Sequence, residues 1–296
     1  MSDSVPEASV PGRIVRWAEA LASVRAVILT SSRARAGARV DALSDYDVIL
    51  YASDPAPFLR DGSWTADLGT VLVQLPARGQ EHAWAYPSRL VLYEDGTKID
   101  FTVLSVGVLR AAAETSRLPE ELDAGYRVLL DKDDVATALP VPSGSAYILS
   151  PPTQEEYAAL VEEFWWEATY VAKSLWREEL LPARFSLECV LKLDLLRRML
   201  EWRVALDHDW TYRPGVMGRG LKAHLAPELW GELEQTFTGA AMEENWRALS
   251  RTIALFRTVA IEVAHQLALE YPDRLDDRTT RYLEAIRTSA SPDDIG

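Results

Sequence analysis

VILTSSRARAGARVDALSDYDVILY, residues 27–51, holds two short apolar runs with a polar segment between them. The runs Val27–Thr30 and Val48–Leu50 have the length and composition of buried strands. Asp45 and Asp47 directly precede the second run. Because side chains two residues apart in a strand point to the same face, we expect these two carboxylates to lie side by side at the start of a buried strand.

Two carboxylates on one face need a cation nearby, because their negative charges otherwise repel each other. Carboxylate oxygens suit Mg²⁺, which proteins commonly hold together with the phosphates of a substrate. The turn Ser31-Ser32-Arg33, just upstream, would supply hydroxyls, backbone N–H groups and a positive charge where such a phosphate would lie. The plain alternative is a surface strand that begins with two solvated aspartates.

A third carboxylate, Asp100, lies in the alternating stretch Lys98–Leu104, where Lys98 would share its face. If this strand lies beside the one that carries Asp45 and Asp47, three carboxylates converge and can bind one or two divalent ions. The pattern leaves open whether Asp100 is a metal ligand, the general base for an acceptor hydroxyl, or both.

The chain is acidic, with a formal net charge of −14 over 296 residues. An acidic protein is a poor partner for nucleic acid, whose binding depends on neutralised phosphates, and a good host for a polycationic small molecule. Acidity that serves only solubility is the alternative. With no apolar run near twenty residues and one cysteine, Cys189, we expect a cytoplasmic protein without a membrane partner, either a monomer or a weak homodimer.

A change in composition at residues 137–152 (TALPVPSGSAYILSPP) divides the chain. Its prolines and its Ser-Gly-Ser are typical of a linker. Short apolar runs precede it and long helical patterns follow it. We expect an α+β fold, with a mixed-sheet domain over residues 1–136, a linker over 137–152 and a C-terminal helical bundle over 153–296. Helices are expected over residues 13–23, 153–179, 185–206, 222–236, 243–269 and 278–287, and loops over 1–11 and 76–87.

The order of these motifs resembles that of the DNA polymerase β-like nucleotidyltransferase superfamily, in which [G/S]-S-R is followed by D-x-D and later by a lone Asp on another strand. Four further motifs are similar to those of the aminoglycoside 6-adenylyltransferase (streptomycin adenylyltransferase) family, and the resemblance covers roughly residues 12–290. These motifs are Glu163–Trp166 (EFWW), Thr169–Lys173 (TYVAK), Leu195–Met199 (LLRRM) and Tyr271-Pro272.

One departure from the superfamily pattern is Ser31, which stands where glycine is usual. Glycine permits a close backbone approach and a positive φ, so this change puts catalytic efficiency in question more than the fold.

The resemblance implies a reaction that uses ATP as co-substrate and Mg²⁺, with two ions expected. An acceptor hydroxyl would attack the α-phosphate in line, AMP would be transferred and pyrophosphate would leave. The acceptor would be the 6-hydroxyl of the streptidine ring of streptomycin, and the result would be antibiotic resistance. The active site is expected between the two domains.

The resemblance also implies roles for individual residues. Asp45, Asp47 and Asp100 would be the catalytic, metal-binding carboxylates. A lysine of the first long helix would reach the nucleotide phosphates, although Lys173 could equally be a solvated helix residue and Arg33 could instead form a salt bridge. The nucleotide-binding candidates are Ser31, Ser32, Arg33, Tyr170 and Lys173.

An aminoglycoside acceptor is a polyhydroxylated cation, so carboxylates would pair with its amino or guanidino groups and an aromatic face would pack a ring. Glu163, Trp166, Glu167 and Asp194 are the candidates for this role. The neighbouring Trp165 could also contact the acceptor, and the alternative for it is that its side chain simply packs in the core. Two other functions stay open: the same transfer to another antibiotic or to a protein hydroxyl, and a non-catalytic protein that binds nucleotide or drug.

Overall fold

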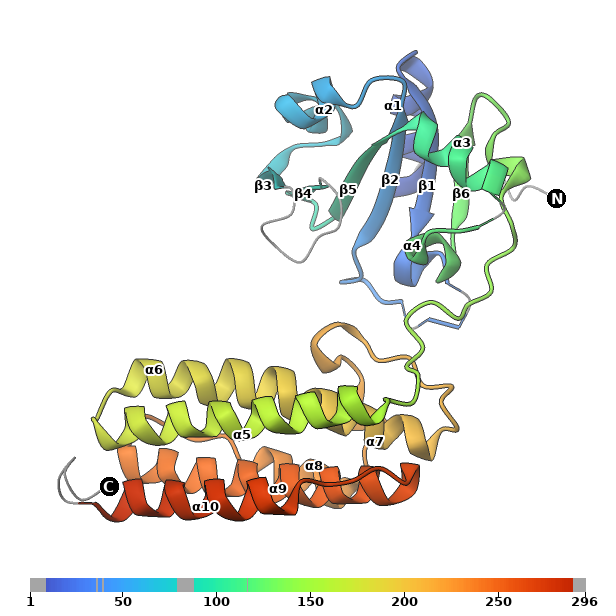
Figure 1. Cartoon of the computed structure of the whole chain (residues 1–296). Helices are drawn as coiled ribbons and strands as arrows, with labels where there is room; N and C mark the ends of the chain where they lie inside the picture. Colours follow the sequence, from blue (N-terminus) through green and yellow to red (C-terminus); the bar gives the residue numbers. More distant parts are fainter. Residues whose placement is uncertain (1–8, 36, 39, 79–87, 116, 290–296) are drawn as a thin grey trace. The chain divides into compact units, whose positions relative to one another are not determined.

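The chain folds into two units, Met1–Tyr147 and Ile148–Gly296, which are described separately below. Their elements are drawn in the computed structural model of Figure 1, which describes residues 9–35, 37–38, 40–78, 88–115 and 117–289. The boundary falls inside the segment 137–152. The expected terminal loop lies mostly outside the described residues, and so does the part of the 76–87 loop from residue 79 onward.

The N-terminal unit is built around a six-stranded sheet of order β3-β4-β5-β2-β1-β6. Strand β2 pairs with β5 in parallel, and the other neighbours pair antiparallel, so the sheet is mixed as expected. The strands are β1 Val24–Thr30, β2 Tyr46–Ala52, β3 Val71–Arg78, β4 Ser88–Tyr93, β5 Lys98–Ser105 and β6 Arg127–Asp131.

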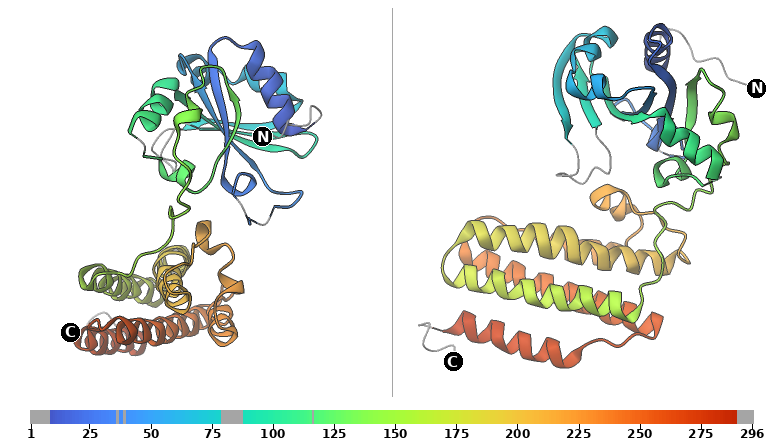
Figure 2. Two further views of the ribbon diagram at one scale, coloured as in Figure 1. Left: turned by 90° about the vertical axis from the view of Figure 1, so that its right-hand side faces the viewer. Right: turned by 45° about the horizontal axis from the view of Figure 1, so that its top comes forward.

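Helices cover both faces of this sheet, as the two views of Figure 2 show. On one face, helix α1 (Val10–Ala20) packs through Ile14 against Leu29 and Leu50. On the other, helix α3 (Val106–Thr115) packs through Leu109 against alternate residues of the same strands. Strands β1 and β2 are therefore buried on both sides, which explains why their sequences contain continuous apolar runs. Shorter helices are α2 Ala56–Arg60 and α4 Glu120–Asp123.

The described part of the C-terminal unit contains helices and no strand. Its most extensive contact is between α5 and the π-helical segment Phe185–Leu196, and α10 packs along α5. The core includes the stacked rings of Phe164 and Phe256, whose centroids are 3.6 Å apart. The helices are α5 Gln154–Trp176, α6 Leu180–Arg184, a π-helical segment Phe185–Leu196, α7 Arg197–Asp207, α8 Pro227–Glu234, α9 Met242–Leu267 and α10 Asp273–Thr288.

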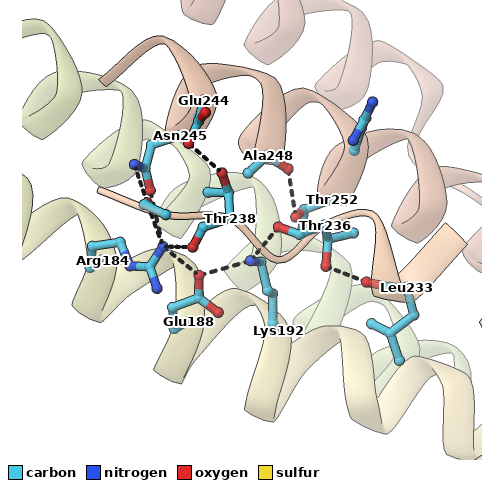
Figure 3. A network of polar contacts seen from close by, with 12 residues as sticks. Arg184, Glu188, Lys192, Leu233, Thr236, Thr238, Glu244, Asn245, Ala248 and Thr252 are labelled. Carbon is cyan, nitrogen blue, oxygen red and sulfur yellow. Dashed lines mark hydrogen bonds and ion pairs between the residues drawn. The ribbon is translucent and has the colours of Figure 1, made fainter. Parts of the chain in front are cut away.

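The π-helical segment carries a buried polar network, drawn in Figure 3. The fully buried Lys192 ammonium donates to Glu188 Oε1 at 2.9 Å and to the Thr236 carbonyl at 2.6 Å. Arg184 donates to the Thr238 carbonyl at 2.8 Å. Because these donors satisfy carbonyls of the turn before α9, the network holds that turn against the π-helical segment.

Several helix boundaries differ from the sequence expectation. Helix α1 begins at Val10 rather than at residue 13, because the Ser9 side chain accepts a hydrogen bond from the Gly12 N–H and caps it. Helix α5 ends at Trp176 rather than at residue 179, and Glu178 beyond it has a left-handed φ of 57°.

Two more helices begin at other residues than expected. Helix α8 spans only Pro227–Glu234 of the expected 222–236, because a proline is well suited to the first helical turn and poorly suited to a helix interior. Helix α10 begins at Asp273, earlier than residue 278, with acidic side chains in its first turn. In the described part of the chain, no helix combines the length and the apolar character that crossing a membrane requires.

Candidate active site

Strand register places the three predicted carboxylates at one end of the central strands. In the antiparallel pair of β1 and β2, Asp47 lies opposite Thr30, the last residue of β1. In the parallel pair of β2 and β5, Asp47 lies opposite Asp100. The turn that follows β1 therefore meets the start of β2, and both lie beside Asp100.

Lys98 joins two of these carboxylates. Its ammonium donates to Asp45 Oδ2 at 2.5 Å and to Asp100 Oδ2 at 3.1 Å. The side chain of Asp100 is nearly buried, whereas those of Lys98 and Asp45 are each more than a third exposed. The sequence placed Lys98 on the same face as Asp100 without giving it a role, although its spacing of two residues from Asp100 was the available signal.

The electrostatics of the site make it costly to ionise every carboxyl group. Burial, and next the charge of Asp100, raise the pKa of Asp47 to about 6, although a hydrogen bond from Ser31 opposes this. Burial also raises the pKa of Asp100, against the opposing effect of Lys98. For Lys98, burial opposes the charged form, but pairing with Asp45 and Asp100 outweighs it and raises the pKa.

These carboxylates fit a divalent cation by their chemistry. Asp100 Oδ1 is buried and has no hydrogen-bond partner, which is costly unless something else satisfies it. Oxygen ligands of this kind suit Mg²⁺. Across the described ranges, no three His, Cys, Asp or Glu side chains are gathered closely enough to hold a metal as they stand. The side chains of Asp45 and Asp100 instead meet around the ammonium of Lys98.

The turn Ser31–Arg33 is a short 3-10 helix that starts in a strained conformation. Ser31 has a φ of 57°, in the left-handed region that glycine tolerates best. Its hydroxyl hydrogen-bonds the Asp47 carboxylate. Serine thus retains the backbone geometry that glycine would adopt and adds a contact to the candidate site. Ser32 is partly buried in the same turn.

Arg33 holds the loop that leads into β2. Its guanidinium donates to the Ser44 carbonyl at 2.7 Å and to the Asp45 carbonyl at 3.1 Å. It also lies 3.9 Å from the centroid of the Tyr46 ring. In this structure the guanidinium contacts backbone carbonyls and an aromatic ring, which fixes the approach to Asp45, and its role toward phosphate stays a prediction.

The remaining nucleotide candidates lie in the C-terminal unit. The Lys173 ammonium is 5.8 Å from the centroid of the Tyr170 ring and 5.7 Å from that of Tyr282 on α10. Tyr170 is 44% exposed. The two predicted residues are therefore neighbours on α5, and Tyr282 is a third member that the sequence did not single out.

The acceptor candidates divide between two sides of α5. Glu163 and Glu167 influence each other, and burial raises the pKa of Glu167 against a hydrogen bond from Ser186 of the π-helical segment. Trp166 is 63% exposed and faces α10 instead. Asp194, in the π-helical segment, has its Oδ1 3.7 Å from the guanidinium of Arg197 at the start of α7. The two glutamates are therefore close to each other on α5. Trp166 lies on a different side of the same helix, toward α10.

Trp166 lines a pocket of about 350 Å³ that the sequence did not predict. Trp165 also lines it and is buried, in agreement with core packing. Glu162 is the acidic residue of its lining. The full lining is Glu162, Trp165, Trp166 and Thr169 of α5 with Pro272, Leu275 and Thr279.

Comparisons with known proteins agree along almost the whole chain. A family model described as Streptomycin adenylyltransferase matches residues 7–286. The aminoglycoside 6-adenylyltransferase of Bacillus subtilis is 30% identical over 274 residues, covering 90% of this chain and 92% of the relative. That of Campylobacter jejuni is 29% identical over 273 residues, covering 91% and 92%.

A solved structure is also similar. The crystal structure of an aminoglycoside 6-adenyltransferase from Bacillus subtilis is 26% identical, covers 95% of this chain and 99% of its own, and has a TM-score of 0.48. The family model and the two sequence relatives, which span nearly the full length, decide the assignment. The chain therefore belongs to the streptomycin adenylyltransferase family and is a nucleotidyltransferase enzyme.

Proposed function

We propose that this enzyme transfers AMP from ATP to a hydroxyl of an aminoglycoside in a Mg²⁺-dependent reaction, with the 6-hydroxyl of streptomycin as acceptor. The supporting observation is the register that sets Asp47 beside Asp100 and next to the Ser31 turn, in a member of the streptomycin adenylyltransferase family. Residues 1–136 form the nucleotidyltransferase domain, 137–152 the linker and 153–296 the acceptor-side domain.

The carboxylates hold the metal and prepare the acceptor. Asp45 and Asp47 bind Mg²⁺, which when bound would neutralise the charge on the nucleotide phosphates. Asp100 completes the ligand set or accepts the proton of the acceptor hydroxyl. Its raised pKa suits a base, which must take up a proton, and its unpartnered Oδ1 suits a metal ligand.

The proposed nucleotide contacts are the Ser31–Arg33 turn and the pair of Tyr170 and Lys173 on α5. Ser32 donates to a phosphate oxygen, and Ser31 holds the Asp47 carboxylate in place. Arg33 supports these contacts through the loop that it fixes. Lys173, beside Tyr170, supplies a positive charge to the phosphates.

The acceptor contacts come from α5 and the π-helical segment. Trp166 is the aromatic platform for a ring, since a large exposed indole beside a pocket is well suited to stack on a sugar or a cation. Glu163, Glu167 and Asp194 pair with positively charged groups of the drug. The net charge of −14 adds a long-range attraction for a polycationic acceptor. The expected setting is the cytoplasm, with a small-molecule partner.

Mass spectrometry of streptomycin after incubation with the protein, ATP and Mg²⁺ tests the proposal directly. A gain of one AMP that disappears in EDTA would support it. Competition with other aminoglycosides and with lincosamide-like drugs then identifies the preferred acceptor. Unmodified drug, despite bound ATP measured by calorimetry, would contradict the streptomycin assignment and favour another acceptor or a binding protein.

The acceptor assignment has its own test in Trp166→Ala. We expect the KM for the acceptor to rise about fivefold, since a cation–aromatic contact contributes about 1 kcal/mol. The matched control is Leu181→Ala, which removes another exposed apolar side chain (81% exposed) of the same unit. Equal KM values in both variants would exclude Trp166 from the acceptor site.

A further inference from the structure

The strand register, and not only the length of its side chain, brings Lys98 close to Asp45 and Asp100. Tyr46 lies opposite Ile99 in the parallel pair of β2 and β5, so Asp45, one residue earlier, is level with Lys98. Lys98 and Asp100 are two residues apart on β5 and share a face. The backbone thus presents the lysine between the two carboxylates that it contacts.

The ammonium contacts one oxygen of each of two carboxylates that a divalent cation would need. It takes Oδ2 of Asp45 and Oδ2 of Asp100 at hydrogen-bond distance. An ammonium and a metal ion cannot both sit against the same carboxylate oxygens, because two cations in such proximity repel each other. The side chain of Lys98 is 37% exposed, which leaves it room to turn toward solvent.

We propose that Lys98 is an internal counter-ion that occupies the carboxylates in the metal-free enzyme and yields them to the incoming divalent cation. It is a positioning residue, which holds the carboxylates of Asp45 and Asp100 close together before the substrates bind. Its displacement weakens the binding of metal alone. The released ammonium then becomes available to the triphosphate, so metal and nucleotide bind with positive coupling. This inference rests on the proposed function, since it takes Asp45 and Asp100 as metal ligands.

Mn²⁺ binding in the absence of nucleotide, measured from the electron paramagnetic resonance of the free ion, tests the competition without any turnover. We expect Lys98→Met to bind Mn²⁺ roughly tenfold more tightly, a typical size for coupling between two ligands. Lys98→Arg, which keeps the charge, should resemble the wild type. Lys222→Met is the control for the loss of a lysine elsewhere, since Lys222 is 68% exposed in the other unit.

A second readout is thermal unfolding in EDTA. There Lys98→Met should unfold at a lower temperature than the wild type, because its carboxylates have lost their counter-ion. If Lys98→Met does not fold, Lys98→Gln removes the charge while it keeps a hydrogen-bond donor, and the same tighter Mn²⁺ binding is expected.

The outcomes separate this inference from the proposed function. Unchanged or weaker Mn²⁺ binding in the neutral variants, with AMP transfer intact in the wild type, overturns only the role of Lys98. Tighter Mn²⁺ binding in the neutral variants, with no AMP transfer by the wild type, supports the counter-ion and contradicts the proposed reaction. A wild type and neutral variants that all fail to bind Mn²⁺ contradict both.

Discussion

Replacing Asp47 with asparagine removes a carboxylate that the metal-free site disfavours. Burial and the neighbouring Asp100 raise its pKa from the ordinary 3.8 to about 6. In the unfolded chain the group returns to its ordinary value. Between about pH 4 and pH 6 the folded protein therefore binds more protons than the unfolded chain, and the free energy of unfolding falls as the pH rises.

The size of the effect follows from the same shift. Raising a pKa from 3.8 to about 6 corresponds to about 3 kcal/mol, at roughly 1.4 kcal/mol for each pKa unit. The wild type carries this full cost above pH 6 and none of it below about pH 4. Asparagine has nearly the same shape and can still accept the hydrogen bond from Ser31. We therefore expect Asp47→Asn to be about 2–3 kcal/mol more stable than the wild type at pH 7.5.

Urea denaturation in EDTA, followed by circular dichroism at pH 7.5 and at pH 4, measures this difference. Asp45→Asn is the matched control, because Asp45 is 39% exposed and paired with Lys98, so its removal should give no stabilisation. AMP transfer should be lost in Asp47→Asn even though the protein is more stable. A variant that is no more stable than the wild type at pH 7.5, or a difference of equal size at pH 4, would refute the reasoning.

Substitutions centred on three further residues, Ser31, Lys192 and Arg257, test other parts of the fold by denaturant unfolding. Ser31→Gly should be about 1 kcal/mol more stable than Ser31→Ala, because both lose the hydroxyl and only glycine adopts the positive φ freely; equal stabilities would argue against strain. Lys192→Met should lower the free energy of unfolding by about 2–4 kcal/mol, since Glu188 then loses its buried partner; a loss under 1 kcal/mol would contradict this. Arg257→Gln should cost about 2 kcal/mol, because Arg257 makes two hydrogen bonds of 2.6 Å to the buried Asp276, and a double-mutant cycle with Asp276→Asn should reveal the coupling; additive effects would exclude it.

Much of the fold could be predicted from the sequence because the signals are local. Continuous apolar runs identified the central strands, since strands covered on both faces have no polar side to show. The helix expected from residue 153 begins as α5 at Gln154, where Thr153 and Glu156 form a capping box. The family resemblance rested on short motifs in order, and the comparisons confirmed it over residues 7–286. Helix ends were less predictable, because side-chain caps such as Ser9 on Gly12 depend on the local conformation.

In the candidate site, the sequence indicates which residues take part, and the tertiary structure decides where they lie. The sequence by itself predicted that Asp45 and Asp47 share a face and that Asp100 lies on a later strand. Only the tertiary structure decided that β2 and β5 are parallel neighbours in a register that sets Asp47 opposite Asp100. The position of Lys98 between two carboxylates and the raised pKa of Asp47 follow from that register. Sequence patterns report periodicity along one strand, whereas register, burial and charge pairing depend on which strands meet, and long-range contacts set that.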